Sequence, residues 1–304
     1  MAELYKKWRP KSFNDVVGQD KAITTLKSLR GDKFPHTLLF TGGAGTGKTT
    51  ICRILRTKLE CADLDFMEVN AADDRGIDII RDIRKRMNLA PINGKCRVWL
   101  IDECHQLTAQ AQESFLKILE DTPKHVYFFL ASTDPQKLKK TIISRSTEIK
   151  LQQIPGDVLD ALVERIGKEE GASVNGDVKA KIVELAEGSA RKALVFLNQV
   201  IGIDGDDKQL EVLEAADVRK QAVEIARALL AKGTTWKKMA EILSAVDEEA
   251  ESIRWLVLGY MTAVALKGNP TKACRIIDEF RDNFYDSKKA GLVASCYQVI
   301  SGGE

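Results

Sequence analysis

The chain has 304 residues, of which 44% are hydrophobic and 30% charged, a balance that describes a soluble globular protein of two or three domains. The formal net charge of +2 excludes a strongly basic chain, so binding to a polyanion would need a local patch of cations. The longest apolar run, at residues 255–266, is too short to cross a bilayer, and the opening residues lack the apolar segment of a secretory signal.

Strand-like and helical patterns alternate up to about residue 153. This alternation predicts an α/β domain, a parallel sheet with helices on both of its faces. The expected strands lie at residues 37–40, 65–70, 96–102, 126–133 and 146–152.

Helical patterns alone follow Pro155. Three amphipathic segments, at 157–171, 176–188 and 190–202, precede a polar break near 202–208. Further helices are expected at 221–233, 236–246, 249–268, 271–284 and 288–300. We therefore expect an α/β domain at 1–153, a three-helix domain at 154–205 and an all-helical domain at 206–304.

A phosphate-binding loop is predicted after the first strand. Gly42, Gly47, Lys48 and Thr49 fit the pattern G-x-x-x-x-G-K-[ST], with a strand before it and a helix after it. Glycines let the backbone approach phosphates, and the N–H groups of the helix start then face the anion. Lys48 would reach the β- and γ-phosphates and Thr49 would bind Mg²⁺. The alternative is a glycine turn that caps a helix. The expected nucleotide-binding residues of the loop are Gly42, Gly43, Ala44, Gly45, Thr46, Gly47, Lys48, Thr49 and Thr50.

Acidic and hydroxyl side chains end two later strands. Asp102 would hold Mg²⁺ through its water shell, and Glu103 would deprotonate a water for attack on the γ-phosphate. Thr133 or Ser132 would lie within reach of the γ-phosphate or of that water. The alternatives are an acidic pair that caps the next helix and ordinary Ser/Thr capping.

The six cysteines, at residues 52, 61, 96, 104, 274 and 296, lack paired spacing. We expect free thiols in a reducing cytoplasm and no zinc site.

These motifs together resemble the AAA+ ATPases, and more narrowly the clamp-loader subunits: bacterial DNA polymerase III gamma/tau, the small subunits of replication factor C and the loader ATPases of large phages. The stretches that carry the resemblance are residues 4–19, 42–50, 69–83, 98–108, 130–146 and 188–194. The resemblance implies ATP and Mg²⁺ as cofactors, a lid formed by the three-helix domain and an oligomerisation collar formed by the last domain.

The resemblance also implies roles for single residues. Arg145, in Ser-Arg-Ser where the family has Ser-Arg-Cys, would be an arginine finger inserted into a neighbouring subunit's ATP site. Arg191 would contact the γ-phosphate from the lid, and Thr133 would be the sensor at the strand end. Val16 and Val17 would line the adenine pocket.

The segment at residues 75–89 is the expected partner surface. Ile77, Ile80 and Ile83 should pack inward, and the clamp-loader resemblance implies that Arg75, Arg81 and Lys85 contact DNA. The alternative is a solvated basic face balanced by Asp78 and Asp82. Met87 and Leu89 look exposed and would contact the sliding clamp, with core packing as the alternative.

The resulting hypothesis is an ATPase subunit that opens a ring-shaped clamp and places it on primer–template DNA. ATP binding would assemble several copies, with a different companion subunit, into a ring-like pentamer, and hydrolysis would release the clamp. Two alternatives remain: another AAA+ DNA motor, such as a branch-migration helicase or a helicase loader, and a structural subunit without catalysis. No membrane partner is expected.

Overall fold

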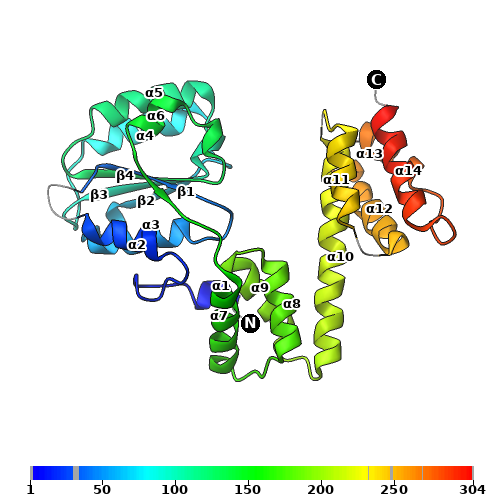
Figure 1. Ribbon diagram of the computed structural model, residues 1–304. Coiled ribbons are helices and arrows are strands. Elements are labelled where there is room, and N and C mark those ends of the chain that lie inside the picture. The colour runs from blue at the N-terminus through cyan, green and yellow to red at the C-terminus, as the bar shows by residue number, and fades with distance from the viewer. Residues whose placement is uncertain (1–2, 30–33, 232, 247–248, 269, 303–304) are drawn as a thin grey trace. The chain divides into compact units, whose positions relative to one another are not determined.

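The computed structural model describes residues 3–29, 34–231, 233–246, 249–268 and 270–302 (Figure 1). The chain divides into two compact units, Met1–Gly202 and Ile203–Glu304, each of which has its own core. Residue 232 of the predicted helix at 221–233 lies outside the described residues.

A five-stranded parallel sheet forms the centre of the first unit, as the sequence predicts. Its order is β2-β3-β4-β1-β5. The strands are β1 (Thr37–Thr41), β2 (Phe66–Asn70), β3 (Arg97–Asp102), β4 (Val126–Ser132) and β5 (Thr147–Lys150). The three central strands are apolar because both of their faces are covered.

Helices cover the two faces of this sheet (Figure 1). One face packs against α2 (Asp20–Ser28) and α3 (Lys48–Lys58). The other packs against α4 (Ile77–Met87), α5 (Ala109–Glu120) and α6 (Lys140–Ser144). Successive strand residues alternate between the two cores: Val98 and Leu100 enter the first, and Trp99 and Ile101 enter the second. Short 3₁₀ turns lie at Asp63–Asp65 (η2), Cys104–Gln106 (η3) and Pro135–Lys137 (η4).

Three helices complete the first unit after β5. They are α7 (Gly156–Glu169), α8 (Gly176–Ala186) and α9 (Ala190–Val200), and the short N-terminal α1 (Leu4–Lys7) packs on α9. The Asn175 and Ser189 side chains cap the starts of α8 and α9 by accepting backbone N–H bonds, so each helix begins where the polar residue precedes the apolar pattern.

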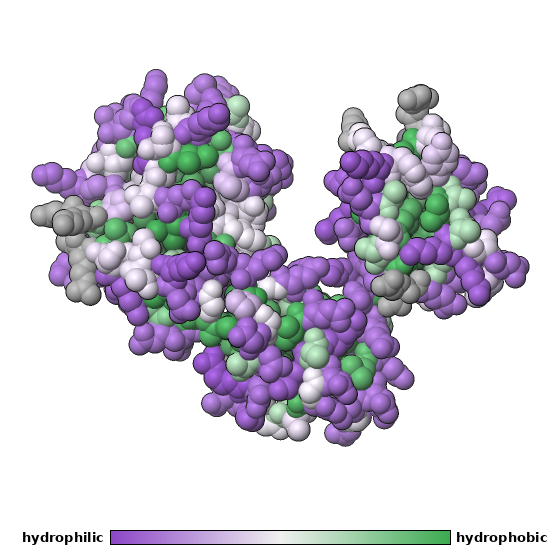
Figure 2. Space-filling model, in the orientation of Figure 1, coloured by the Kyte–Doolittle hydropathy of each residue, from purple (hydrophilic) through white to green (hydrophobic). Residues whose placement is uncertain are grey.

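The second unit consists of helices. These are α10 (Asp206–Leu230), α11 (Trp236–Ser244), α12 (Ala250–Leu266), α13 (Pro270–Glu279) and α14 (Lys288–Ser301). One apolar core joins all five. Figure 2 shows that hydrophilic side chains cover most of the visible surface of each unit. Apolar side chains are visible among these hydrophilic ones. No helix of the described residues has the length and apolarity that a bilayer span requires.

A buried ion pair fixes the β2–β3 edge of the sheet. The Asp65 carboxylate is fully buried and accepts the backbone N–H groups of Ile92, Asn93 and Gly94, as well as an Arg97 N–H at 3.4 Å. Burial by itself raises the pKa of Asp65, but these donors outweigh it and hold the pKa below its ordinary value.

Asp65→Ala should lower the free energy of unfolding of the first unit by about 3–5 kcal/mol, because Arg97 and three N–H groups lose their acceptor. Since the Asp65 pKa is lowered by folding, this stabilisation should be complete above its ordinary value of 3.8 and be lost as pH falls through the folded value. Urea unfolding followed by hydrogen exchange in β2 and β3 measures both effects. The exposed Asp78→Ala, which breaks only a surface pair with Arg81, is the control and should change stability by less than about 0.5 kcal/mol.

Candidate nucleotide-binding site

The loop between β1 and α3 has the shape of a phosphate cradle. Gly42 has φ +145° and lies against the Leu151 carbonyl, where a Cβ would collide with the backbone. The buried Lys48 ammonium donates to the carbonyl oxygens of Gly42 and Gly43, at 2.9 Å each. These bonds hold the lysine ammonium against the loop, where an anion would be bound.

The electrostatics of Lys48 suit an anionic ligand. Burial lowers its pKa, while the carboxylates of Glu103 and Asp102 raise it, and burial is the larger effect. A phosphate beside the ammonium would favour its charged form, so ligand binding and the charge on Lys48 support each other.

A hydroxyl and a carboxylate meet beside the loop. Thr49 Oγ1 donates to Asp102 Oδ2 at 2.8 Å, although the two residues are 53 positions apart in the sequence. Hard oxygen ligands of this kind are the ones that Mg²⁺ takes in nucleotide sites. The pair predicted to bind the metal is therefore brought together.

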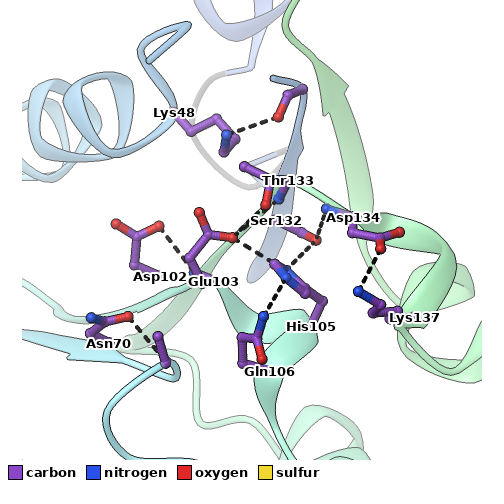
Figure 3. Close-up of polar contacts among 12 residues, drawn as sticks. Lys48, Asn70, Asp102, Glu103, His105, Gln106, Ser132, Thr133, Asp134 and Lys137 are labelled. Atoms are coloured by element: carbon purple, nitrogen blue, oxygen red, sulfur yellow. Dashed lines mark hydrogen bonds and ion pairs between the residues drawn. The ribbon is translucent and has the colours of Figure 1, made fainter. Parts of the chain in front are cut away.

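Glu103 stands at the end of β3 in a left-handed backbone conformation, with φ +48°. This conformation is uncommon for a residue with a side chain and costs of order 1–3 kcal/mol, so it occurs where the surrounding structure enforces it. Glu103 Oε2 accepts a hydrogen bond from Thr133 Oγ1 at 2.8 Å (Figure 3). The predicted sensor residue therefore contacts the predicted base.

Two residues that the sequence analysis did not select complete this cluster. His105 lies in η3 beside Glu103 and Ser132, and Gln106 contacts the other side of the imidazole ring. Their arrangement depends on the turn at Glu103, and no sequence pattern marks that turn.

Helices α7 and α9 close the site from the other side. Ser189 and Arg191, at the start of α9, pack against Gly45 of the phosphate loop, where φ is +75° and an added Cβ would collide with Ser189 Oγ. The Arg191 guanidinium lies 5.7 Å from the centroid of the Tyr5 ring, a cation–π contact. Tyr5 is a further residue that sequence reasoning missed, because α1 and α9 are distant in the chain.

One pocket brings most of the predicted residues together. Of these, Val16, Val17, Ala44–Thr50, Asp102, Glu103 and Arg191 line it. The N-terminal segment adds Trp8, Arg9 and Pro10. Thr133, Gly42 and Gly43 do not line the pocket. Thr133 contacts Glu103, which does, and the two glycines accept hydrogen bonds from Lys48.

Arg145 lies apart from this pocket. It caps the end of α6, its guanidinium donates to Glu120 Oε1 at 2.6 Å, and its side chain is 40% exposed. The arginine is therefore available on the surface of this unit rather than at the chain's own phosphate loop.

The basic residues after β2 are exposed. Arg75 precedes α4 and donates to the Ala72 carbonyl, whereas Arg81 pairs with Asp78 on the helix surface. Lys85 is exposed one turn further along α4. Ile80 and Ile83 are buried and Ile77 is half-buried, so the apolar and basic faces of α4 are arranged as predicted.

The expectation that Met87 is exposed is wrong. Met87 is 3% exposed and packs in the same core as Ile80 and Ile83, because a spacing of three or four residues keeps it on the inward face of α4. Leu89, beyond the helix end, is 58% exposed. In the following loop, the backbone N–H of the exposed Ile92 donates to the Asp65 carboxylate.

Comparisons with known proteins agree with this geometry. A family described as DNA polymerase III, delta subunit, matches residues 60–155. DNA polymerase III subunit gamma/tau of Mycobacterium tuberculosis is 32% identical and covers 92% of this chain and 50% of its own. The tau subunit of Bacillus subtilis is 33% identical over 81% of this chain and 47% of its own, and that of Escherichia coli is 35% identical over 65% and 34%. The chain thus spans about half, or less, of the length of these curated relatives.

A solved structure gives the same fold. RuvB of Thermotoga maritima, described as a Holliday junction branch migration motor, has a TM-score of 0.60 at 20% identity, covering 79% of this chain and 86% of that one. The parallel sheet, the phosphate loop and the helices beside it give the chain the fold of this structure. The similarity to the gamma/tau subunits of DNA polymerase III confirms the resemblance to the clamp-loader group that the sequence predicts.

Gly45→Ala should weaken nucleotide binding about tenfold or more, because the left-handed backbone costs an L-residue roughly 1–2 kcal/mol and the new Cβ would push Ser189 away. Titration calorimetry with a non-hydrolysable nucleotide measures the affinity. Gly202→Ala is the matched control, since Gly202 also has a positive φ, +87°, but open space around it. Equal affinities of the two variants would contradict a role for the Gly45–Ser189 contact.

Proposed function

We propose that the chain is an ATP-hydrolysing subunit of a sliding-clamp loader that acts on primer–template DNA. The observation that supports this most is the assembly of a complete ATPase site, from Lys48 through Glu103 to Arg191, in a relative of the gamma/tau subunits. ATP binding would assemble copies of the chain and a companion subunit into a ring-like pentamer, and hydrolysis would release it.

Each residue of the site has a defined task in this proposal. The N–H groups of the phosphate loop and Lys48 hold the β- and γ-phosphates. Thr49 and Asp102 hold Mg²⁺, which when bound offsets the negative charge on the phosphate oxygens. Glu103 takes a proton from the attacking water, Thr133 orients Glu103, and Arg191 contacts the γ-phosphate from the lid.

Arg145 acts in this proposal on a neighbouring subunit. Its exposure and its distance in the fold from its own phosphate loop support delivery across an interface, after the guanidinium leaves Glu120. A guanidinium is always charged and its planar fork matches phosphate oxygens.

The proposed contact surfaces for DNA and the clamp lie on α4 and beside its two ends. Arg75, Arg81 and Lys85 would contact DNA phosphates, which position a protein without base identity. Leu89 would contact the sliding clamp, and Met87 is no longer part of that surface because it is buried. The all-helical unit would form the collar between subunits.

Two substitutions test the ATPase site. Lys48→Ala should abolish ATP binding, whereas Glu103→Gln should bind ATP normally and lower turnover by about 10²–10⁴-fold, the range of a lost general base. Nucleotide binding and phosphate release measured on the same preparations separate the two effects. Turnover by Glu103→Gln at the wild-type rate would show that Glu103 is not the base.

Arg145→Ala should fold and bind ATP but lower turnover by about 10³–10⁵-fold, because an arginine supplied in trans stabilises charge in the transition state. Wild-type turnover should rise with protein concentration as each site gains a neighbour. Mixing Arg145→Ala with Lys48→Ala chains should restore some activity, since the second variant still supplies Arg145. Full activity of the unmixed Arg145→Ala variant would show that this arginine has no role in ATP hydrolysis.

Replacing Arg75 and Arg81 by Glu should weaken primer–template binding equally for every sequence and make its salt dependence shallower. Fluorescence anisotropy at several salt concentrations tests both statements. Arg281→Glu, which changes an exposed arginine of the other unit, is the control and should bind as wild type. A sequence-selective loss, or an unchanged salt slope, would rule out phosphate contacts by these two arginines.

A further inference from the structure

His105 is a buried histidine that contacts the proposed base without lining the pocket. The residue is 8% exposed, and Nδ1 lies 3.2 Å from Glu103 Oε2 and 3.2 Å from Ser132 Oγ (Figure 3). Nε2 lies 3.0 Å from Gln106 Nε2. The left-handed turn at Glu103 makes this possible, because it folds η3 back toward the side chain that precedes it.

The hydrogen-bond network assigns the proton on this ring. The Gln106 amide nitrogen can only donate, so His105 Nε2 accepts from it and Nδ1 carries the hydrogen of the neutral ring. Nδ1 then faces Ser132 Oγ, its hydrogen-bond partner, and lies 3.2 Å from Glu103 Oε2. Gln106 thereby selects the tautomer in which His105 can donate to the carboxylate.

The carboxylate of Glu103 is held by one oxygen. Oε2 receives Thr133 Oγ1–H at 2.8 Å and the Thr133 backbone N–H at 3.4 Å, and His105 Nδ1 lies 3.2 Å away as an ion-pair contact. Among the described residues, none donates a hydrogen bond to Oε1, and Glu103 lines the pocket. This arrangement leaves Oε1 to accept from a water molecule in the pocket.

We propose that His105 is a positioning residue for ATP hydrolysis, which acts by fixing the orientation of the Glu103 carboxylate. The carboxylate turns about its Cγ–Cδ bond, and Thr133 restrains this rotation through contacts to Oε2. The imidazole of His105, from the η3 turn, contacts the same oxygen from a second element and strengthens that restraint. The inference rests on the proposed function, because it requires Glu103 to be the base.

Three substitutions at position 105 distinguish positioning from simple packing. His105→Leu fills the space but removes the donor. His105→Asn keeps an N–H near the position of Nδ1, whereas His105→Gln places its amide near Nε2 and leaves the Nδ1 position without a donor. The full chain is used with primer–template DNA, at a protein concentration where wild-type turnover has levelled off, and ATP affinity and thermal unfolding report on folding.

His105→Leu and His105→Gln should lower kcat by roughly 10- to 100-fold, the size of effect expected when a reacting group is misplaced, while KM and ATP affinity stay within about twofold. His105→Asn should recover most of kcat. In a Glu103→Gln background, His105→Leu should have no further effect, because the two residues act as one unit. If His105→Leu does not fold, His105→Gln takes its place in the comparison.

The outcomes distinguish the positioning role of His105 from the proposed ATPase function. A wild-type kcat for His105→Leu, in a chain whose Glu103→Gln variant is inactive, overturns the positioning role and leaves the proposed function intact. Equal losses in kcat for the Asn, Gln and Leu variants assign His105 to packing alone. Normal turnover by Glu103→Gln contradicts the proposed function and the positioning role together.

Discussion

The register of the parallel strands is the constraint on which the site depends. Asn70 pairs with Asp102 across β2 and β3, and Thr41 pairs with Ser132 across β1 and β4, so these strands end at one edge of the sheet. A shift of one residue in β3 would turn Glu103 to the opposite face, because strand side chains alternate. The tightly packed apolar cores on both faces prevent that shift, and hence stability and chemistry depend on the same packing.

The contact between the phosphate loop and α9 extends this constraint beyond the sheet. Because Gly45 lies against Ser189 and Arg191, the loop and the start of α9 share one surface within the first unit. The Tyr5 ring contacts the Arg191 guanidinium, so the N-terminal helix joins the same group of contacts. Three segments that are far apart in the sequence therefore meet at the phosphate loop.

The sequence predicted those parts of the fold and site that have a local pattern. The five strands, the loop at Lys48 and the acidic strand end at Asp102 each follow from residues that are adjacent in the chain. Met87 was misjudged because its exposure depends on the phase of α4 relative to the core, and the helix end alone suggested a surface position. His105 and Tyr5 could not be identified, since their contacts arise from a left-handed turn and from packing between distant helices. The role of Arg145 in a neighbouring subunit and the contacts with DNA and the clamp remain predictions, because a single chain contains only one side of each interface.

The ion pair between Arg145 and Glu120 has a consequence for the unassembled chain. Both side chains are largely in solvent, at 40% and 52% exposure, so the pair contributes no more than about 1 kcal/mol. A pair of this strength can be broken at little cost, which the proposed transfer of the guanidinium to a neighbouring triphosphate requires. Because the pair lies near solvent, salt screens it more strongly than it affects the buried contacts of the fold.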